Sequence, residues 1–242
     1  MNIGVIDSGI GGLTVVKELT KLNVNIIYYG DNLNVPYGNK TEEEIYYLSK
    51  KMIDYLINKN VNLIIVACNT ISSIINKYFT NYKVPIISII DPVINYIKTN
   101  NINNTGLLAT KFTINSNIYQ KMLKEKLVYS EISPNLATII DNNYNDKDID
   151  NIIKKHLDNL TKHNIDYLIL GCTHYYLVFD KFLKNNNKLK YINPSLEVVN
   201  YIKDKLISTS NPSLKIYTTG SINTYKSILS KLDINNYKLI KK

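Results

Sequence analysis

Short apolar runs alternate with amphipathic, helix-like stretches along the whole of this 242-residue chain. Runs rich in Ile, Leu and Val are typical of strands that are buried on both faces. The predicted strands cover residues 3–7, 25–30, 63–67, 86–90, 106–110, 167–171, 190–192 and 215–218. Strands that alternate with helices favour parallel sheets joined by crossover helices. We therefore expect an α/β fold.

The helical stretches carry start signals, and the clearest lies at residues 41–58. Thr41 and Glu44 have the spacing of a capping box, in which each side chain satisfies a free backbone N–H group of the first turn. Apolar residues at helical spacing follow them. This pattern predicts an amphipathic helix that covers one face of a sheet.

The pattern of strands and helices runs twice along the chain. Around Asp91 and Pro92 the chain leaves the first set of strands, and a second α/β unit begins that contains the second cysteine. We expect two similar doubly wound α/β domains with parallel sheets, formed by residues 1–92 plus 204–242 and by residues 93–203. These domains are expected to face each other across an active-site cleft.

The two cysteines stand at matching positions. Cys68 ends the apolar run 63–67, Cys172 ends the run 168–171, and each precedes polar residues suited to start a helix. Open α/β sheets bind ligands at the carboxyl ends of their strands, and a nearby helix N-terminus can lower the pKa of a thiol. One buried cysteine alone is usually an inert apolar residue. The matched pair suggests two-base chemistry at one shared centre.

Composition argues against several classes of protein. No apolar run is long enough to cross a membrane and no signal-peptide pattern precedes the first strand, so we expect a cytoplasmic protein with free thiols. Three His and two Cys without ligand spacing predict no metal site. The net charge of +9 comes from scattered lysines without any arginine, which argues against a nucleic-acid interface and favours a solvated basic surface.

A glycine-rich turn follows the first predicted strand. It contains Asp7 and Ser8, and then Gly9, Gly11 and Gly12. Such glycines let a backbone approach a ligand closely, and the helix that follows offers N–H groups to an anion. The spacing fits neither the dinucleotide fingerprint nor the Walker motif.

Two other strand ends carry residues suited to a pocket. Pro36, Tyr37 and Gly38 form a stiff turn with a phenol at its tip. Thr110 and Thr113 offer hydroxyl groups that suit a carboxylate. Without arginine, any carboxylate would have to be bound by hydroxyls, backbone N–H groups and lysines.

These motifs together resemble glutamate racemases over nearly the whole chain. The blocks that carry the resemblance stand in the family's order and approximate spacing: Asp7-Ser8-Gly9 with Gly11-Gly12-Leu13-Thr14, Pro36-Tyr37-Gly38, Ala67-Cys68-Asn69-Thr70, Ala109-Thr110 with Thr113, and Gly171-Cys172-Thr173-His174-Tyr175. Within the wider aspartate/glutamate racemase superfamily, the Asp7-Ser8 opening and His174 resemble the glutamate branch more than the aspartate branch.

The resemblance implies a cofactor-independent enzyme that interconverts L- and D-glutamate and supplies D-glutamate for peptidoglycan. It implies that Cys68 and Cys172 are the two bases, with Asp7 serving Cys68 and His174 serving Cys172. It also implies a substrate-binding set: Ser8, Pro36, Tyr37, Gly38, Asn69, Thr70, Thr110, Thr113 and Thr173. The family further suggests a homodimer.

Two positions depart from the family pattern. Glutamate racemases commonly have a Glu in the stretch that corresponds to residues 134–141, and this chain offers the shorter Asp141. Whether that carboxylate reaches His174 is therefore open. Tyr176 stands where a Pro is usual, which predicts a less rigid loop beside His174.

Two other functions stay open at this stage. One is a racemase of aspartate or a related small dicarboxylate, which the pocket residues alone do not exclude. The other is a catalytically weak binding protein, because some family members are associated with inhibition of DNA gyrase and the basic charge suits an acidic partner. Relative rates on glutamate and aspartate distinguish the two racemases. The effect of removing each thiol distinguishes a racemase from a binding protein.

Overall fold

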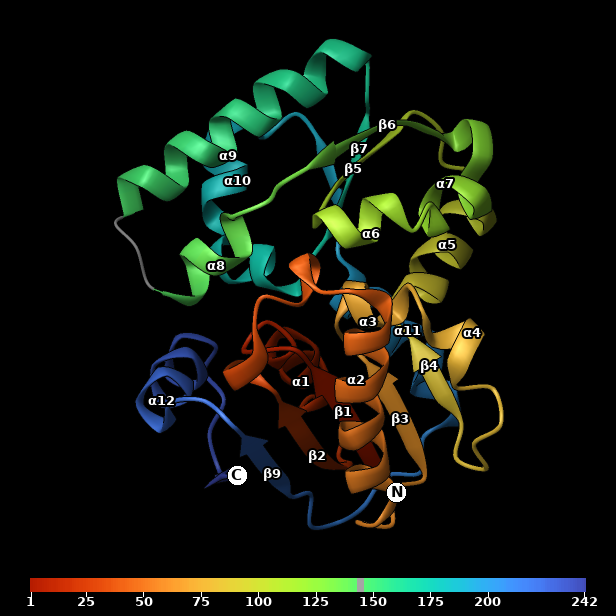
Figure 1. Ribbon diagram of the computed structural model, residues 1–242, viewed down its shortest axis with the longest axis vertical. Coiled ribbons are helices and arrows are strands. Elements are labelled where there is room, and N and C mark those ends of the chain that lie inside the picture. The colour runs from red at the N-terminus through yellow and green to blue at the C-terminus, as the bar shows by residue number, and fades with distance from the viewer. Residues whose placement is uncertain (143–145) are drawn as a thin grey trace.

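Two separate parallel sheets form the centre of the computed structural model, which describes residues 1–142 and 146–242 (Figure 1). The first sheet has the strand order β10-β9-β2-β1-β3-β4, and the second has the order β6-β5-β7-β8. Every paired strand in both sheets runs parallel to its neighbour. The α/β class with two parallel-sheet units, predicted from the alternating pattern, is confirmed.

The strand bounds are as follows: β1 (Asn2–Asp7), β2 (Asn25–Gly30), β3 (Leu63–Val66), β4 (Ile86–Ser88), β5 (Thr105–Ala109), β6 (Leu127–Ile132), β7 (Tyr167–Gly171), β8 (Lys190–Ile192), β9 (Leu214–Thr218) and β10 (Tyr237–Lys241). The α-helices are α1 (Leu13–Leu19), α2 (Glu42–Ile57), α3 (Asn69–Ser72), α4 (Ile75–Tyr78), α5 (Ile90–Thr99), α6 (Lys111–Asn115), α7 (Ile118–Leu123), α8 (Leu136–Asp141), α9 (Asp146–Leu160), α10 (Phe179–Asn185), α11 (Pro194–Ile202) and α12 (Ile222–Lys231). Short 3-10 turns include η1 (Asn32–Asn34), η2 (Tyr37–Asn39) and η5 (Thr173–Val178).

Helices cover both faces of the first sheet because the side chains of its strands alternate between two apolar layers. Ile65 packs in the layer that also contains residues of α1, α5 and α11, while Ile64 and Val66 pack in the layer under α2. The expected capping box starts α2, because Thr41 accepts from the Glu44 N–H group and Glu44 accepts from the Thr41 N–H group.

Helix α11 ties the two sheets together. It packs against α1 and α5 and also contacts β7 of the second sheet. At its start, the hydroxyls of Thr14 in α1 and Ser195 in α11 lie 2.8 Å apart, and both residues are buried. The segments that follow the strand ends of one sheet therefore meet those of the other: α6 contacts α3 and η2, and η5 contacts α1 (Figure 1).

The sequence patterns missed two strands and extended one of the predicted strands two residues too far. Strands β6 and β10 lie at sheet edges, where half-exposed residues break the continuous apolar run that marks a central strand. The predicted strand 86–90 ends at Ser88, because α5 begins at Ile90. Strands β9 and β10 join the first sheet. The domain boundaries after residues 92 and 203 stay a prediction.

In the part of the chain that the structure describes, no helix combines the length and apolar character needed to cross a membrane.

We predict that Ile65→Ala lowers the free energy of unfolding by about 2–5 kcal/mol, because it leaves a cavity in the middle of the first sheet. Ile65 is 0% exposed and its strand lies between β1 and β4. Urea denaturation measures the change. The matched control is Ile207→Ala, at a residue that is 71% exposed, with an expected change within about 0.5 kcal/mol. Equal effects of the two substitutions would contradict this account of the core.

Candidate functional site

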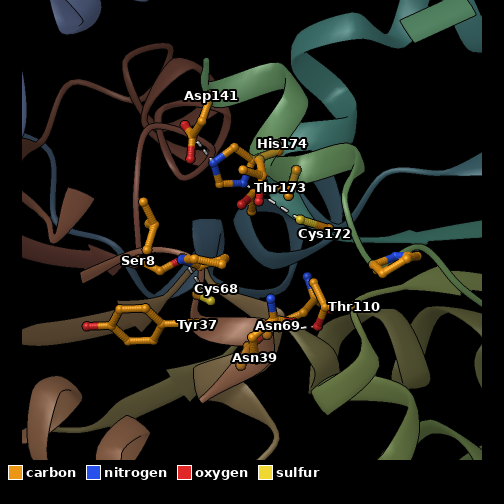
Figure 2. A pocket seen from close by; sticks show the side chains of 18 residues that line it. Ser8, Tyr37, Asn39, Cys68, Asn69, Thr110, Asp141, Cys172, Thr173 and His174 are labelled. Carbon is orange, nitrogen blue, oxygen red and sulfur yellow. Dashed lines mark hydrogen bonds and ion pairs between the residues drawn. The ribbon is translucent and has the colours of Figure 1, made fainter. Parts of the chain in front are cut away.

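The two cysteines lie at the carboxyl ends of strands in different sheets. Cys68 stands between β3 and α3, and Cys172 stands between β7 and η5. Both are free thiols and both are buried. They line one pocket between the two halves of the molecule, the first half being the part built around the first sheet and the second half the part built around the second sheet. Figure 2 shows their sulfur atoms entering the pocket from different loops. The pocket encloses an empty volume of about 550 Å³, including its opening to solvent.

Most of the residues predicted for substrate binding line this pocket. The wall includes Ser8, Pro36, Tyr37, Gly38, Asn69, Thr70, Thr110 and Thr173, together with His174 and both cysteines. Asp7 and Thr113 do not line it: Asp7 lies fully buried behind Ser8, and Thr113 lies fully buried behind Thr70 and Thr110. The structure therefore brings all thirteen predicted residues to one place, two of them as support behind the wall.

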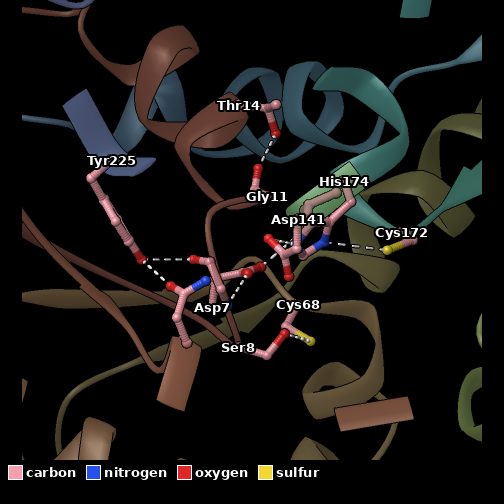
Figure 3. A network of polar contacts seen from close by, with 12 residues as sticks. Asp7, Ser8, Gly11, Thr14, Cys68, Asp141, Cys172, His174 and Tyr225 are labelled. Carbon is pink, nitrogen blue, oxygen red and sulfur yellow. Dashed lines mark hydrogen bonds and ion pairs between the residues drawn. The ribbon is translucent and has the colours of Figure 1, made fainter. Parts of the chain in front are cut away.

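Asp7 joins the two cysteine loops. Its carboxylate accepts a hydrogen bond of 2.8 Å from the Gly9 N–H group and one of 3.1 Å from the Thr173 hydroxyl (Figure 3). Thr173 directly follows Cys172, so a residue of the first sheet holds the loop of the second. Burial raises the pKa of Asp7 to about 6, while the positive charge of His174 and both hydrogen bonds act in the opposite direction.

The glycine-rich turn makes room for this contact. A Cβ atom on Gly11 would lie 2.4 Å from the Thr173 hydroxyl, and one on Gly12 would lie 2.6 Å from Cβ of Asp7. Among the residues that the structure describes, the pocket wall does not include Gly9, Gly11 or Gly12. The close neighbour of Gly11 is thus the other cysteine loop and that of Gly12 is Asp7, while a close approach to a ligand stays a prediction.

Cys68 is held as a thiol. The Ser8 hydroxyl lies 3.5 Å from its Sγ atom. Burial, followed by the negative charge of Asp7, raises the pKa of Cys68 to about 12. The expected lowering by a helix N-terminus does not dominate, because α3 has only four residues and the sulfur is almost entirely removed from water.

Cys172 has a cationic partner. Nδ1 of His174 lies 3.7 Å from Sγ of Cys172, and Nε2 of His174 lies 3.1 Å from a carboxylate oxygen of Asp141 (Figure 3). Burial opposes the charged imidazolium, but Asp141 and Cys172 together raise the pKa of His174 well above its ordinary value. The short side chain of Asp141 does reach His174, because α8 contacts η5 and ends at this residue.

Tyr176 holds the loop beside His174. Its hydroxyl donates to the Ile192 carbonyl at 2.7 Å, and its ring stacks on Phe179. The absence of the usual Pro is therefore offset by a hydrogen bond that anchors η5 to the end of β8.

Hydroxyl groups from both halves meet at the opposite end of the pocket. Oγ1 of Thr70 lies 3.0 Å from that of Thr110 and 3.5 Å from that of Thr113. Thr110 also caps α6 by accepting from the Thr113 N–H group. These hydroxyls, with the side-chain amide of Asn69, give the pocket donors that suit a carboxylate.

Tyr37 contributes its ring to the pocket wall and directs its hydroxyl elsewhere. The hydroxyl donates to Asp31 at 2.7 Å, and Figure 2 shows it pointing away from the cysteines. Burial and the charge of Asp31 raise the pKa of Tyr37. The phenol is therefore a neutral donor that fixes the turn at Pro36.

Sequence reasoning missed several residues of the site. Asn39, Pro134, Ala137 and Thr138 line the pocket without having been predicted. Asn39 adjoins the Pro36–Gly38 turn, so its position was a usable signal. The other three lie at or just before α8, whose contact with η5 no local pattern reveals. The hydroxyl oxygen of Tyr225, in α12, lies 3.1 Å from the Gly9 carbonyl oxygen (Figure 3). Tyr225 thereby supports the turn that follows Asp7.

A metal centre finds no support in the residues that the structure describes, where no group of three or more His, Cys, Asp or Glu side chains could hold an ion.

Known proteins are similar to this chain in both sequence and fold. The family model described as Asp/Glu/Hydantoin racemase matches residues 13–200. A curated glutamate racemase from Fusobacterium nucleatum is 39% identical over 206 residues, which cover 81% of this chain and 78% of that protein.

Among solved structures, a glutamate racemase isoform from Bacillus anthracis superposes with a TM-score of 0.87 at 30% identity, covering 98% of this chain and 95% of that one. A glutamate racemase from Francisella tularensis in complex with D-glutamate has a TM-score of 0.84 at 32% identity, covering 99% and 95%.

We predict that Asp141→Asn lowers the pKa of His174, because a nearby opposite charge favours the protonated imidazole. With the carboxylate removed, His174 loses its proton at a lower pH. The chemical shift of its ring protons against pH measures the change. Glu131→Gln is the matched control, since it alters the carboxylate beside His156, 2.9 Å from that ring and outside the pocket. An unchanged His174 pKa in Asp141→Asn would contradict the assigned ion pair.

Proposed function

We propose, from the premise that this chain belongs to the Asp/Glu/Hydantoin racemase family, that it interconverts L- and D-glutamate with Cys68 and Cys172 as its two bases. The observation that carries the proposal is the pair of buried thiols that enter one pocket from different sheets. The glutamate racemases among the curated relatives of this chain are amino-acid racemases. The Francisella tularensis structure contains D-glutamate.

Inversion of an α-carbon requires removal of a weakly acidic proton from one face and delivery of a proton to the other. A single base on one side would return the proton to the face that it left. In the proposed mechanism one cysteine abstracts the proton as a thiolate, and the opposite cysteine donates its proton as a thiol. For the other enantiomer the two residues exchange roles.

The surroundings of each sulfur suggest how its proton is managed. His174, kept protonated by Asp141, places a positive charge beside the sulfur of Cys172. Asp7 lies behind Ser8 near Cys68, and its raised pKa of about 6 lets the carboxyl group hold or release a proton close to neutral pH. The ammonium group of a bound amino acid would add a positive charge to this region and lower the pKa of the Cys68 thiol.

The polar wall suggests how glutamate is oriented. Thr70, Thr110 and the amide of Asn69 would bind a carboxylate, and Ser8 and Asp7 stand on the side suited to the ammonium group. Because this chain has no arginine, neutral donors carry carboxylate recognition. The same donors hydrogen-bond the negative charge that develops as the α-proton leaves. No cofactor is needed in this scheme.

We further propose that the D-glutamate formed is used for peptidoglycan, and that the protein acts in the cytoplasm as a homodimer. Rescue of growth in a bacterial strain that depends on added D-glutamate tests the first statement. Sedimentation of the purified protein tests the last.

Proton NMR in D2O tests the activity directly. We expect the purified protein, without added cofactor, to remove the α-proton signal of both L-glutamate and D-glutamate while the opposite enantiomer appears. Exchange with aspartate but not with glutamate would assign the chain to another dicarboxylate. Exchange with neither would favour the binding protein and contradict the proposal.

We predict that Cys68→Ala and Cys172→Ala each reduce racemisation by at least about 100- to 10,000-fold, the usual contribution of a positioned acid or base. Each variant keeps one thiol, which faces only one side of the substrate. Any remaining α-proton exchange in D2O is therefore confined to one enantiomer, and the two variants retain opposite enantiomers. NMR with each pure enantiomer measures this.

Ser49→Ala is the control for the cysteine variants. Ser49 is fully buried in α2 of the first half, and its hydroxyl donates to the Ile45 and Tyr46 carbonyls of its own helix. Its loss should leave the racemisation rate unchanged. Full activity in either cysteine variant, or retention of the same enantiomer by both, would rule out the two-thiol mechanism.

A further inference from the structure

A buried tyrosine of the second half holds the side chain of Asn69. Tyr119 lies in α7, and Asn69 begins α3 directly after Cys68. The Tyr119 hydroxyl donates to Oδ1 of Asn69 at 2.7 Å. Tyr119 is 0% exposed and Asn69 is 2% exposed, so both partners of this bond are buried.

The other end of the Asn69 amide is left without a partner. Nδ2 is buried and makes no hydrogen bond to any residue that the structure describes. A buried donor without an acceptor carries a desolvation cost of about 1–3 kcal/mol. Asn69 lines the pocket, and Figure 2 shows it between Cys68 and Thr110. The missing acceptor is therefore expected to come from a molecule bound in the pocket.

The hydroxyl of Tyr119 determines which way the amide is turned. A phenol has one proton to donate, and an amide accepts only through its oxygen. If the amide turned over, its NH2 group would face the phenol and the phenolic proton would lose its acceptor. Burial, followed by the charge of Asp91, raises the pKa of Tyr119, so the phenol keeps that proton.

We infer that Tyr119 is a positioning residue, which turns the Asn69 amide so that its NH2 group meets a substrate carboxylate. This inference rests on the proposed function. The hydroxyls of Thr70 and Thr110 lie 3.0 Å apart on the same side of the pocket and complete the set of donors. A carboxylate accepts from the amide and from the hydroxyl whose proton is not used within the Thr70–Thr110 pair. An ammonium group would instead meet the donor end of the amide. Tyr119 thereby sets which end of the amino acid binds at α3.

Tyr119→Phe removes the hydroxyl and keeps the ring. We expect kcat/KM for glutamate to fall about 10-fold, mainly through a higher KM, because the amide is no longer held and binding is weakened in the ground state and transition state alike. The control is Tyr191→Phe, which removes a hydroxyl that donates to the Asn186 carbonyl at 2.8 Å, outside the pocket. This control should leave both constants unchanged.

A double-mutant cycle separates positioning from simple packing. In an Asn69→Ala background, Tyr119→Phe should cause no further rise in KM, because the amide that it positions is gone. An equal rise in KM in both backgrounds would show that Tyr119 acts through packing alone and would overturn the inference. An unchanged KM in Tyr119→Phe alone would do the same.

Asn69→Asp gives a second test that leaves Tyr119 in place. The phenol can still donate to one carboxylate oxygen, and the other oxygen then faces the substrate with a negative charge. We expect a KM at least as high as that of Asn69→Ala, whereas a KM near that of the wild type would overturn the inferred orientation. Wild-type protein is assayed first on glutamate. If the wild-type protein is inactive, the proposed function is wrong. If the wild type is active and Tyr119→Phe has the same KM, only the role of Tyr119 is contradicted.

Discussion

The hydrogen bond from Thr173 to the buried carboxylate of Asp7 is the contact on which the geometry of the pocket depends. A carboxylate that is 0% exposed has to be satisfied by nearby donors, and its two donors come from its own turn and from the opposite cysteine loop. Because Thr173 follows Cys172, this one bond fixes the second thiol relative to the first half. Gly11 and Gly12 are needed at the same place, since a Cβ atom on either would enter the contact.

The two thiols have matching positions but different electrostatic surroundings. Cys68 lies with Ser8 and Asp7 in a region where burial and negative charge favour the protonated sulfur. Cys172 lies beside a histidine that Asp141 keeps cationic. An enzyme that acts in two directions needs one base ready to accept a proton and one acid ready to give it. The unequal surroundings are consistent with that need, and a bound ammonium group would reduce the difference.

Local sequence patterns were sufficient for the central strands and for the loops that follow them. Continuous apolar runs identify β1, β3 and β7, and the polar residues after each run place Asp7, Cys68 and Cys172 at strand ends. Edge strands β6 and β10 were not predicted, because many of their residues are partly exposed and the apolar run is interrupted. Tyr119, the partner of Asn69, was not predicted for another reason: it reaches Asn69 from the other half, 50 residues away along the chain. Asp141 was named from the sequence, but its contact with His174 depends on the packing of α8 against η5, which no local pattern reveals.

A crystal structure of the wild-type protein with bound glutamate tests the central claim most directly. The account predicts that the α-carbon lies between the sulfurs of Cys68 and Cys172, on opposite faces and each about 3.5 Å away, the separation of groups poised to react. A glutamate whose α-carbon presents the same face to both sulfurs, or that lies beyond the reach of either one, would contradict a mechanism with two opposed thiols.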